Sequence, residues 1–155
     1  MSLLKQFTAR FLAFVNPSST RGPARRVRIF NETRSTVLAD YAEVADTAPS
    51  RSKGLLGRDG LAHGEALWIV PCESVHTIGM KFDLDLIYLD RKYRVVKIRR
   101  GIVPWRLSAC LRAHSIIEFQ AGALSDTGTV RGDQLAIGPT SFPQASDSTA
   151  IPEPG

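Results

Sequence analysis

Two side chains that often act as metal ligands or nucleophiles, Cys72 and His76, lie four residues apart in this 155-residue chain. On a strand they would share one face but lie roughly 13 Å apart, so binding one ion would need a bend, for instance at Pro71. A zinc site needs three or four ligands. The other donors, which follow no zinc-finger spacing, are Cys110, His63, His114, Asp83 and Asp85. We therefore expect no metal or other cofactor, with Cys72, His76 and Cys110 as the alternative ligand set.

Nucleophilic catalysis is a second chemistry open to these residues. A cysteine is activated when an imidazole lies beside it, so Cys72 or Cys110 could pair with His76 or His114. The two cysteines could also meet across strands as a disulfide or redox couple. Such pairs depend on which side chains meet in the folded protein, so the sequence does not decide whether they form. The plainer interpretation is that the cysteine is a buried thiol and that the histidine is hydrogen-bonded within a strand.

Asp85 stands out because apolar residues surround it in the run LDLIYLD, residues 84–90. Alternation along a strand leaves apolar side chains on both faces, so Asp85 should be buried. A buried carboxylate needs a partner, and the candidates are Arg51, Arg58 and His76. We favour an ion pair that attaches the segment of Arg51 and Arg58 to the sheet. The alternative is a general base that works with His76 in a hydrolase-type or carbohydrate-active enzyme.

Basic residues dominate the next segment, residues 91–112, which contains no acidic residue: Arg91, Lys92, Arg94, Lys97, Arg99, Arg100, Arg106 and Arg112. The rings of Tyr88, Tyr93 and Trp105 lie nearby in sequence, and such a composition can bind single-stranded nucleic acid. Alternation along a strand, however, splits the charges between two faces. This favours a solvated edge strand protected by lysine and arginine, and nucleic-acid binding is the weaker alternative.

Short apolar runs between turn residues predict a mainly β protein. We predict a strand region broken near Ala39 and Asp40, and a short helix near residues 48–57 with Thr47 as N-cap and Pro49 in its first turn. Residues 101–113 are predicted as a loop. The predicted strand regions are 27–31, 36–46, 66–70, 74–80, 84–90, 93–100, 114–119 and 134–137. The fold class is a compact single-domain β-sandwich of jelly-roll-like character, or a barrel, with one short helix.

Composition divides the chain into three parts. Residues 1–24 form a basic arm and linker, residues 25–137 the β domain, and residues 138–155 a tail rich in proline and serine that we expect to be disordered. Six of the 20 basic residues and no acidic residue precede Glu32, while the remainder holds 14 basic and 15 acidic residues, so the net positive charge lies before Glu32, in the arm and the first residues of the β domain. Apolar spacings of three and four over residues 3–15 predict an amphipathic helix that could contact a membrane surface weakly.

The N-terminus gives no sign of a signal peptide or a membrane span. No apolar run reaches the roughly 18 residues needed to cross a bilayer, and the apolar stretch at residues 11–15 is not followed by a cleavage site. Two cysteines are too few for a disulfide scaffold. We therefore expect a soluble, cytoplasmic protein, with membrane contact through residues 3–15 as a further option.

Several motifs occur in an order that resembles one known family. They are RSKGLLGR at residues 51–58, EALWI at 65–69, PCESVHTIGM at 71–80, LDLIYLD at 84–90, IIEFQAG at 116–122 and GDQL at 132–135. Over residues 39–137 this order is similar to the domain-of-unknown-function family 192, also called uncharacterised protein family 127. The resemblance implies a compact, mainly β single domain with one short helix. It implies no reaction.

The resemblance also implies a set of shared positions, which match Gly54, Leu55, Asp85, Glu118, Gly122, Gly132 and Asp133. The pattern Cys-x3-His-Thr-x-Gly-Met, matched by residues 72–80, resembles one branch of the family only. This weakens a catalytic role for His76 that the whole family would share. Many relatives carry an export or lipoprotein signal, and this chain departs from them.

Together these features favour a non-enzymatic module that binds a small molecule or a protein. Its pocket would lie near the segment from His76 to Asp85, and the short helix would close one end. The residues expected to contact a ligand or to form a structural clasp are Arg51, Arg58, His76, Asp85 and Glu118. The alternatives are an enzyme that uses Asp85 with His76 and a basic nucleic-acid-binding protein.

Overall fold

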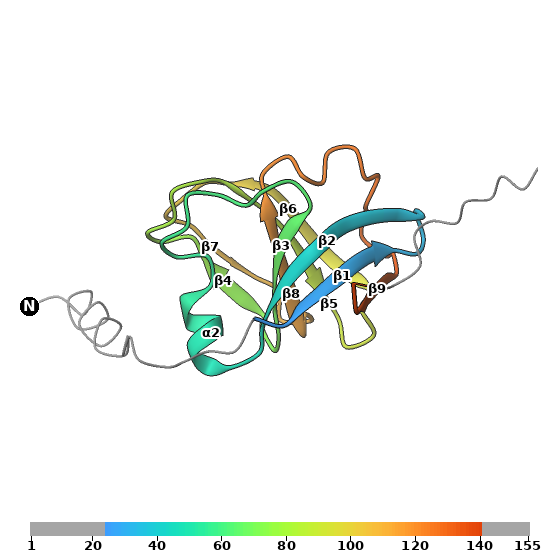
Figure 1. The fold of residues 1–155 in the computed structure, drawn as a ribbon, viewed down its shortest axis with the longest axis horizontal. Coiled ribbons are helices and arrows are strands. Elements are labelled where there is room, and N and C mark those ends of the chain that lie inside the picture. The colour runs from blue at the N-terminus through green and yellow to red at the C-terminus, as the bar shows by residue number, and fades with distance from the viewer. Residues whose placement is uncertain (1–23, 141–155) are drawn as a thin grey trace, which may run out of the picture.

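A computed structural model describes residues 24–140 and shows a curled β sheet with a single short helix in that range (Figure 1). The helix, α2, spans Ala48–Lys53. The strands are β1 (Arg26–Asn31), β2 (Thr36–Ala45), β3 (Glu65–Ile69), β4 (Ser74–His76), β5 (Leu84–Leu89), β6 (Val95–Ile102), β7 (Leu107–Ala109), β8 (Ser115–Gln120) and β9 (Leu135–Gly138). The predicted mainly β fold with one short helix is confirmed.

Seven strands form the main sheet in the order β6-β5-β8-β3-β2-β1-β9, and β4 pairs with β7 in a separate sheet. Among the paired strands of residues 24–140, only β2 and β3 run parallel, and α2 lies in the connection that carries the chain back. The two edge strands meet at one end, where the Val95 N–H donates to the Asp133 carbonyl over 2.9 Å and the Leu135 N–H donates to the Tyr93 carbonyl over 3.0 Å. Because the edge strands meet at one end, the sheet curls into a half-barrel. This shape is closer to the predicted barrel than to a jelly roll.

The strands depart most from the prediction at three places. β2 continues through Ala39 and Asp40, and the irregularity expected there is a pair of register shifts against β1. β4 ends at His76 instead of continuing to residue 80. β7 forms inside the segment predicted as a loop, because its backbone groups pair with those of β4.

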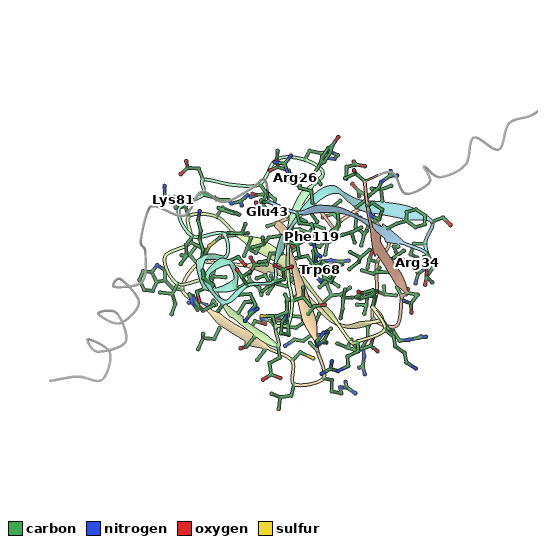
Figure 2. All side chains as sticks on the ribbon, turned by 60° about the horizontal axis from the view of Figure 1, so that its bottom comes forward. Arg26, Arg34, Glu43, Trp68, Lys81 and Phe119 are labelled. Carbon is green, nitrogen blue, oxygen red and sulfur yellow. The ribbon has the colours of Figure 1, made fainter. Side chains whose placement is uncertain are left out.

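Apolar clusters cover both faces of the central strands. On one face Ile87 packs in a cluster with Trp68 and Phe119, which lie in the interior of the domain in Figure 2. On the other face Leu86 and Tyr88 belong to a second cluster, which lies under the segments around α2 and β4. All six residues of β5 are buried, as the apolar character of both of its faces predicted.

The ends of the chain lie outside this description. The predicted amphipathic helix at residues 3–15 falls there, and so does most of the predicted tail, so both stay predictions. Between residues 24 and 140, no helix is both long enough and apolar enough to cross a membrane.

Candidate functional site

A cavity of about 210 Å³ lies between α2, the loop after it, β4 and β8. Figure 1 shows α2 next to β4 at one end of the sheet. A few polar and charged groups converge there on apolar walls, which is typical of small-molecule sites, although drug-sized pockets are larger, at roughly 300–1,000 Å³. The lining residues are Arg51, Ser52, Lys53, Gly54, Leu55, Leu56, Ile69, Pro71, Cys72, Ser74, Val75, His76, Met80 and Glu118.

Capping residues at both ends of α2 determine where this helix begins and ends, and the helix forms one wall of the cavity. Thr47 is the N-cap: its hydroxyl accepts a hydrogen bond from the Ser50 N–H, and the Ser50 hydroxyl accepts one from the Thr47 N–H. Gly54 ends the helix, because its φ of 49° and ψ of −133° are readily adopted only by glycine. The helix is therefore shorter than predicted. Its last turn brings Arg51 and Lys53 to the cavity.

Glu118 is the buried carboxylate of the cavity. It lies in the middle of β8, in register with Leu67 on β3 and Leu86 on β5, and is only 5% exposed. Burial raises the pKa of Glu118 to about 7, because the surrounding residues do not replace the water that the charged form has lost. Within the described part of the chain, no hydrogen bond or opposite charge offsets this effect of burial on its pKa.

Cys72 lines the cavity as a thiol, not as an activated nucleophile. The thiol is half-buried and donates to the Ser74 carbonyl over 3.1 Å. Burial is the main cause that raises the pKa of Cys72. The charge of Glu118 adds to the rise, while the hydrogen bond to Ser74 and the charge of Arg51 oppose it. His76 lines the same cavity and has contacts of its own, but the hydrogen bond of the thiol goes to the backbone and not to an imidazole.

The two arginines predicted to pair with Asp85 have other partners. Arg51 donates from Nη1 to the Asp46 carbonyl over 2.8 Å, a neutral acceptor that leaves its positive charge on the cavity wall. Arg58 forms an ion pair with Glu43 of β2 and does not line the cavity. The predicted ion pair between the helix segment and Asp85 is therefore wrong.

Asp85 is buried as predicted, but backbone amides hold it in place of a cation. Its carboxylate accepts hydrogen bonds from the N–H groups of Gly101, Gly122 and Leu124 at 2.9, 3.0 and 3.3 Å. These bonds fasten β5 to the end of β6 and to the turn after β8. Asp85 is 1% exposed and faces the side of β5 away from the cavity, so it forms no catalytic pair with His76. Its role is a structural clasp.

The alternative metal site is not assembled in the structure. In residues 24–140, no three His, Cys, Asp or Glu side chains lie close enough together to hold a metal ion. The set Cys72, His76 and Cys110 therefore does not form a site. Both cysteines are free thiols, so the disulfide alternative is not formed either.

A second polar cluster joins the end of β1 to the loop before β9. The buried Asn31 amide donates to the Thr129 hydroxyl and to the Asp133 carboxylate, at 3.1 and 3.0 Å. Burial opposes the ionisation of Asp133, but hydrogen bonds from Arg34, Asn31 and the Val130 N–H outweigh it and lower the pKa of Asp133. These groups satisfy one another, so the cluster is structural.

The basic side chains of β6 are divided between two sides of the strand, as its alternation predicted. Lys97 donates to the Ala109 carbonyl of β7 and lies 5.1 Å from the centre of the Tyr88 ring. Arg100 instead reaches the Thr129 carbonyl, in the loop before β9. β6 therefore offers no single row of cations for a nucleic-acid backbone to follow.

The cavity brings together Arg51, His76 and Glu118 from the predicted site residues and leaves out Arg58 and Asp85. Glu118 had been named from the family resemblance alone. The apolar residues beside it in β8 are the same signal that pointed to Asp85, so the residues themselves could have identified it. The prediction placed Arg51 and the short helix at this pocket but did not name Lys53, which the last turn of α2 also brings to the cavity.

Comparison with known proteins gives a family model and similar chains. Residues 29–137 match the model of the DUF192 family, described as "Uncharacterized ACR". A UPF0127 protein from Thermococcus gammatolerans is 29% identical over 133 residues, which cover 82% of this chain and 86% of that one. Another from Thermococcus kodakarensis is 30% identical over 118 residues, covering 72% and 74%.

Two solved structures share the fold. One is a protein of unknown function from Novosphingobium aromaticivorans, with a TM-score of 0.64, 22% identity, and 79% of this chain and 90% of that chain covered. The other, from Sinorhizobium meliloti, is provisionally described as a transcription regulator, with a TM-score of 0.66, 20% identity, and 77% and 98% covered. At these identities the likeness concerns the fold alone.

Proposed function

Because the chain belongs to the DUF192 family, whose description assigns no reaction, we propose a function from the cavity itself: it binds a small polar molecule between α2, β4 and β8. The observation that carries this proposal is Glu118, which is buried and lines the cavity, and whose pKa burial raises with no offsetting hydrogen bond or charge from residues 24–140. Buried carboxylates are normally paired. A ligand that donates hydrogen bonds to Glu118 would supply the missing partner.

The charges around the cavity indicate which chemical groups would fit. Glu118 would accept hydrogen bonds from an ammonium or hydroxyl group. Arg51 and Lys53 place positive charge on the wall formed by α2. Cys72 lines the same cavity, and the charges of Glu118 and Arg51 both act on its thiol. A small zwitterion, with its ammonium group toward Glu118 and its carboxylate toward Arg51, would match both.

The size of the cavity restricts the ligand further. At about 210 Å³ the cavity is smaller than the roughly 300–1,000 Å³ of sites for drug-sized molecules. A free amino acid of the size of alanine fits this space. A nucleotide or an oligosaccharide would have to extend into solvent.

The test is thermal unfolding with L-alanine, ethylamine and sodium acetate as separate probes. We expect L-alanine to raise the Tm most, because it alone carries both charges. A ligand at ten times its Kd stabilises the folded state by about 1.4 kcal/mol. For a domain of this size, that corresponds to a rise of about 3–6 °C.

Two variants separate binding in the cavity from general salt effects. Glu118→Gln keeps the shape of the side chain and removes its charge, and it should abolish the shift with L-alanine. Glu73→Gln is the matched control, because Glu73 is exposed and does not line the cavity. It should respond like the wild type. An equal shift in both variants, or no shift with any probe, would contradict the proposal.

A hydrolase-type or carbohydrate-active enzyme is the second candidate, and the pKa of Glu118 favours it. A carboxyl group with a pKa of about 7 is suited to general acid–base catalysis near neutral pH. Glu118 would take the role suggested for Asp85, with His76 on the same cavity. Hydrolysis of p-nitrophenyl acetate or p-nitrophenyl glycosides that is lost in Glu118→Gln would support this candidate, and absence of turnover would dismiss it for these substrates.

A further inference from the structure

Exposed apolar side chains gather around β7. Seven large apolar side chains are exposed among residues 24–140, and five of them come from two neighbouring segments: Ile78, Val103, Trp105, Leu107 and Leu111. We call these five residues the β7 ridge. Leu107 and Leu111 are 80% and 84% exposed, and Trp105 is 67% exposed. Single exposed apolar residues are ordinary, whereas a group of them marks an interaction surface.

Hydrogen bonds to Thr77 hold the two segments of the β7 ridge together. The Thr77 carbonyl accepts from the Trp105 N–H over 3.0 Å, and the Thr77 N–H donates to the Arg106 carbonyl over 2.9 Å. The Thr77 hydroxyl donates to the Val103 carbonyl over 2.8 Å. The pairing of β4 with β7 continues the same contact through Leu107. The β7 ridge is therefore a fixed feature of the fold.

The backbone of Trp105 adds a separate observation. Its φ is 64°, in the left-handed region that bulky residues rarely adopt. The Thr77 carbonyl holds its N–H, and the Thr77 hydroxyl accepts from the N–H of the next residue, Arg106, over 2.9 Å. Such conformations persist where the surrounding structure enforces them, and they cluster at functional positions. At Trp105 the hydrogen bonds to Thr77 hold this backbone conformation, while the indole ring of the same residue stays largely exposed.

Two cations, Arg106 and Lys97, lie on or beside the β7 ridge. The eight basic residues of segment 91–112 have no acidic residue among them. The five ion pairs within residues 24–140 all lie outside this segment. Arg106 donates to the Trp105 carbonyl and Lys97 to the Ala109 carbonyl, and both acceptors are neutral. Within residues 24–140, neither Arg106 nor Lys97 therefore has an acidic partner.

We propose that the β7 ridge docks on the surface of an anionic lipid bilayer. Tryptophan prefers the level of the lipid headgroups, leucine side chains enter the acyl region, and arginine reaches the phosphates while its stem stays apolar. Exposed leucines serve this purpose, whereas single-stranded nucleic acid needs aromatic surfaces for its bases. The docking uses residues outside the proposed ligand cavity and does not depend on a bound ligand.

The test is co-sedimentation of the full chain with vesicles of phosphatidylcholine alone and of phosphatidylcholine mixed with phosphatidylglycerol. We expect binding to the mixed vesicles, with a blue shift of tryptophan emission as Trp105 leaves water. The other tryptophan, Trp68, is buried already. Residues 1–24 are basic but contain no tryptophan, so this shift reports on the β7 ridge and not on the arm.

Variants of exposed residues complete the design. Leu107→Ser combined with Leu111→Ser should weaken binding by at least about tenfold, because two leucines no longer enter the acyl region. Arg106→Gln should weaken it by about fivefold. The matched control, Tyr41→Ser combined with Val130→Ser, removes two exposed apolar side chains outside the β7 ridge and should bind like the wild type.

Far-UV circular dichroism and the Tm verify that each variant folds. If the double leucine variant is destabilised, Leu111→Ser alone replaces it. The proposal is overturned if the leucine variant binds the mixed vesicles as the wild type does, or if binding leaves tryptophan emission unchanged. A chain that binds a single-stranded oligonucleotide but neither kind of vesicle would overturn it in favour of nucleic acid. Glu118→Gln should bind vesicles normally, whatever it does to L-alanine binding.

Discussion

Replacing Glu118 by glutamine should change how the stability of the protein depends on pH. The glutamine side chain has nearly the shape of the carboxylate, so the packing against Leu67 and Leu86 is retained. What the substitution removes is a group that ionises inside the protein. The quantity to measure is the difference in free energy of unfolding between variant and wild type. The informative result is how this difference changes with pH.

The magnitude follows from the pKa of Glu118, which burial raises from 4.5 to about 7. The folded state holds the proton to a higher pH than the unfolded state does. The stability linked to this proton is therefore fully present below about pH 4.5, and it is lost as the pH rises through about 7. At about 1.4 kcal/mol for each pKa unit, the loss is about 3 kcal/mol. The variant has no such titration and should gain this amount relative to the wild type.

The assay is urea unfolding of both proteins between about pH 5 and pH 9, with the free energy in water obtained by linear extrapolation. Glu73→Gln serves as the control for loss of a carboxylate, because Glu73 is exposed. We expect its difference from the wild type to stay nearly constant over this range.

A constant difference between Glu118→Gln and the wild type across that range would refute the reasoning. It would mean that the Glu118 carboxylate is hydrated or already paired, and the proposal of a ligand that satisfies it would lose its basis. If the reasoning holds, L-alanine should offset part of the loss of stability that the wild type shows above about pH 7, because a bound ammonium group stabilises the ionised carboxylate.

Three further predictions concern stability. Asp85→Ala leaves three backbone N–H groups without an acceptor, so we expect a loss of at least about 3 kcal/mol in urea unfolding; a change near zero would show that water reaches these amides. The lowered pKa of Asp133 contributes stability that is present above about pH 4 and is lost as the pH falls through the folded-state pKa. The deficit of Asp133→Asn in urea unfolding should therefore shrink in acid, and a deficit independent of pH would contradict this. Gly54→Ala forces a side chain into a conformation suited to glycine, at a cost of about 1–3 kcal/mol, which a Tm equal to that of the wild type would disprove.

Several features of the fold followed from the sequence because they depend on neighbouring residues. The cap formed by Thr47 and the proline in the first turn of α2 are local signals, and the structure has both. The burial of Asp85 followed from the apolar character of both faces of its strand. The strands of the β1–β2 and β5–β6 hairpins were predicted as separate regions, and the two strands of each pair follow one another in the chain through a short turn.

Tertiary structure decided which groups meet. The three amides that hold Asp85 come from β6 and from the turn after β8. Where such bonds form depends on strand register, which side-chain types do not specify, so an arginine partner was equally consistent with the sequence. β7 forms because β4 lies beside it and pairs with it. Its own residues show no pattern that predicts a strand. The cavity likewise joins a carboxylate of β8 to cations of α2, and only the packing of distant elements could bring those charges together.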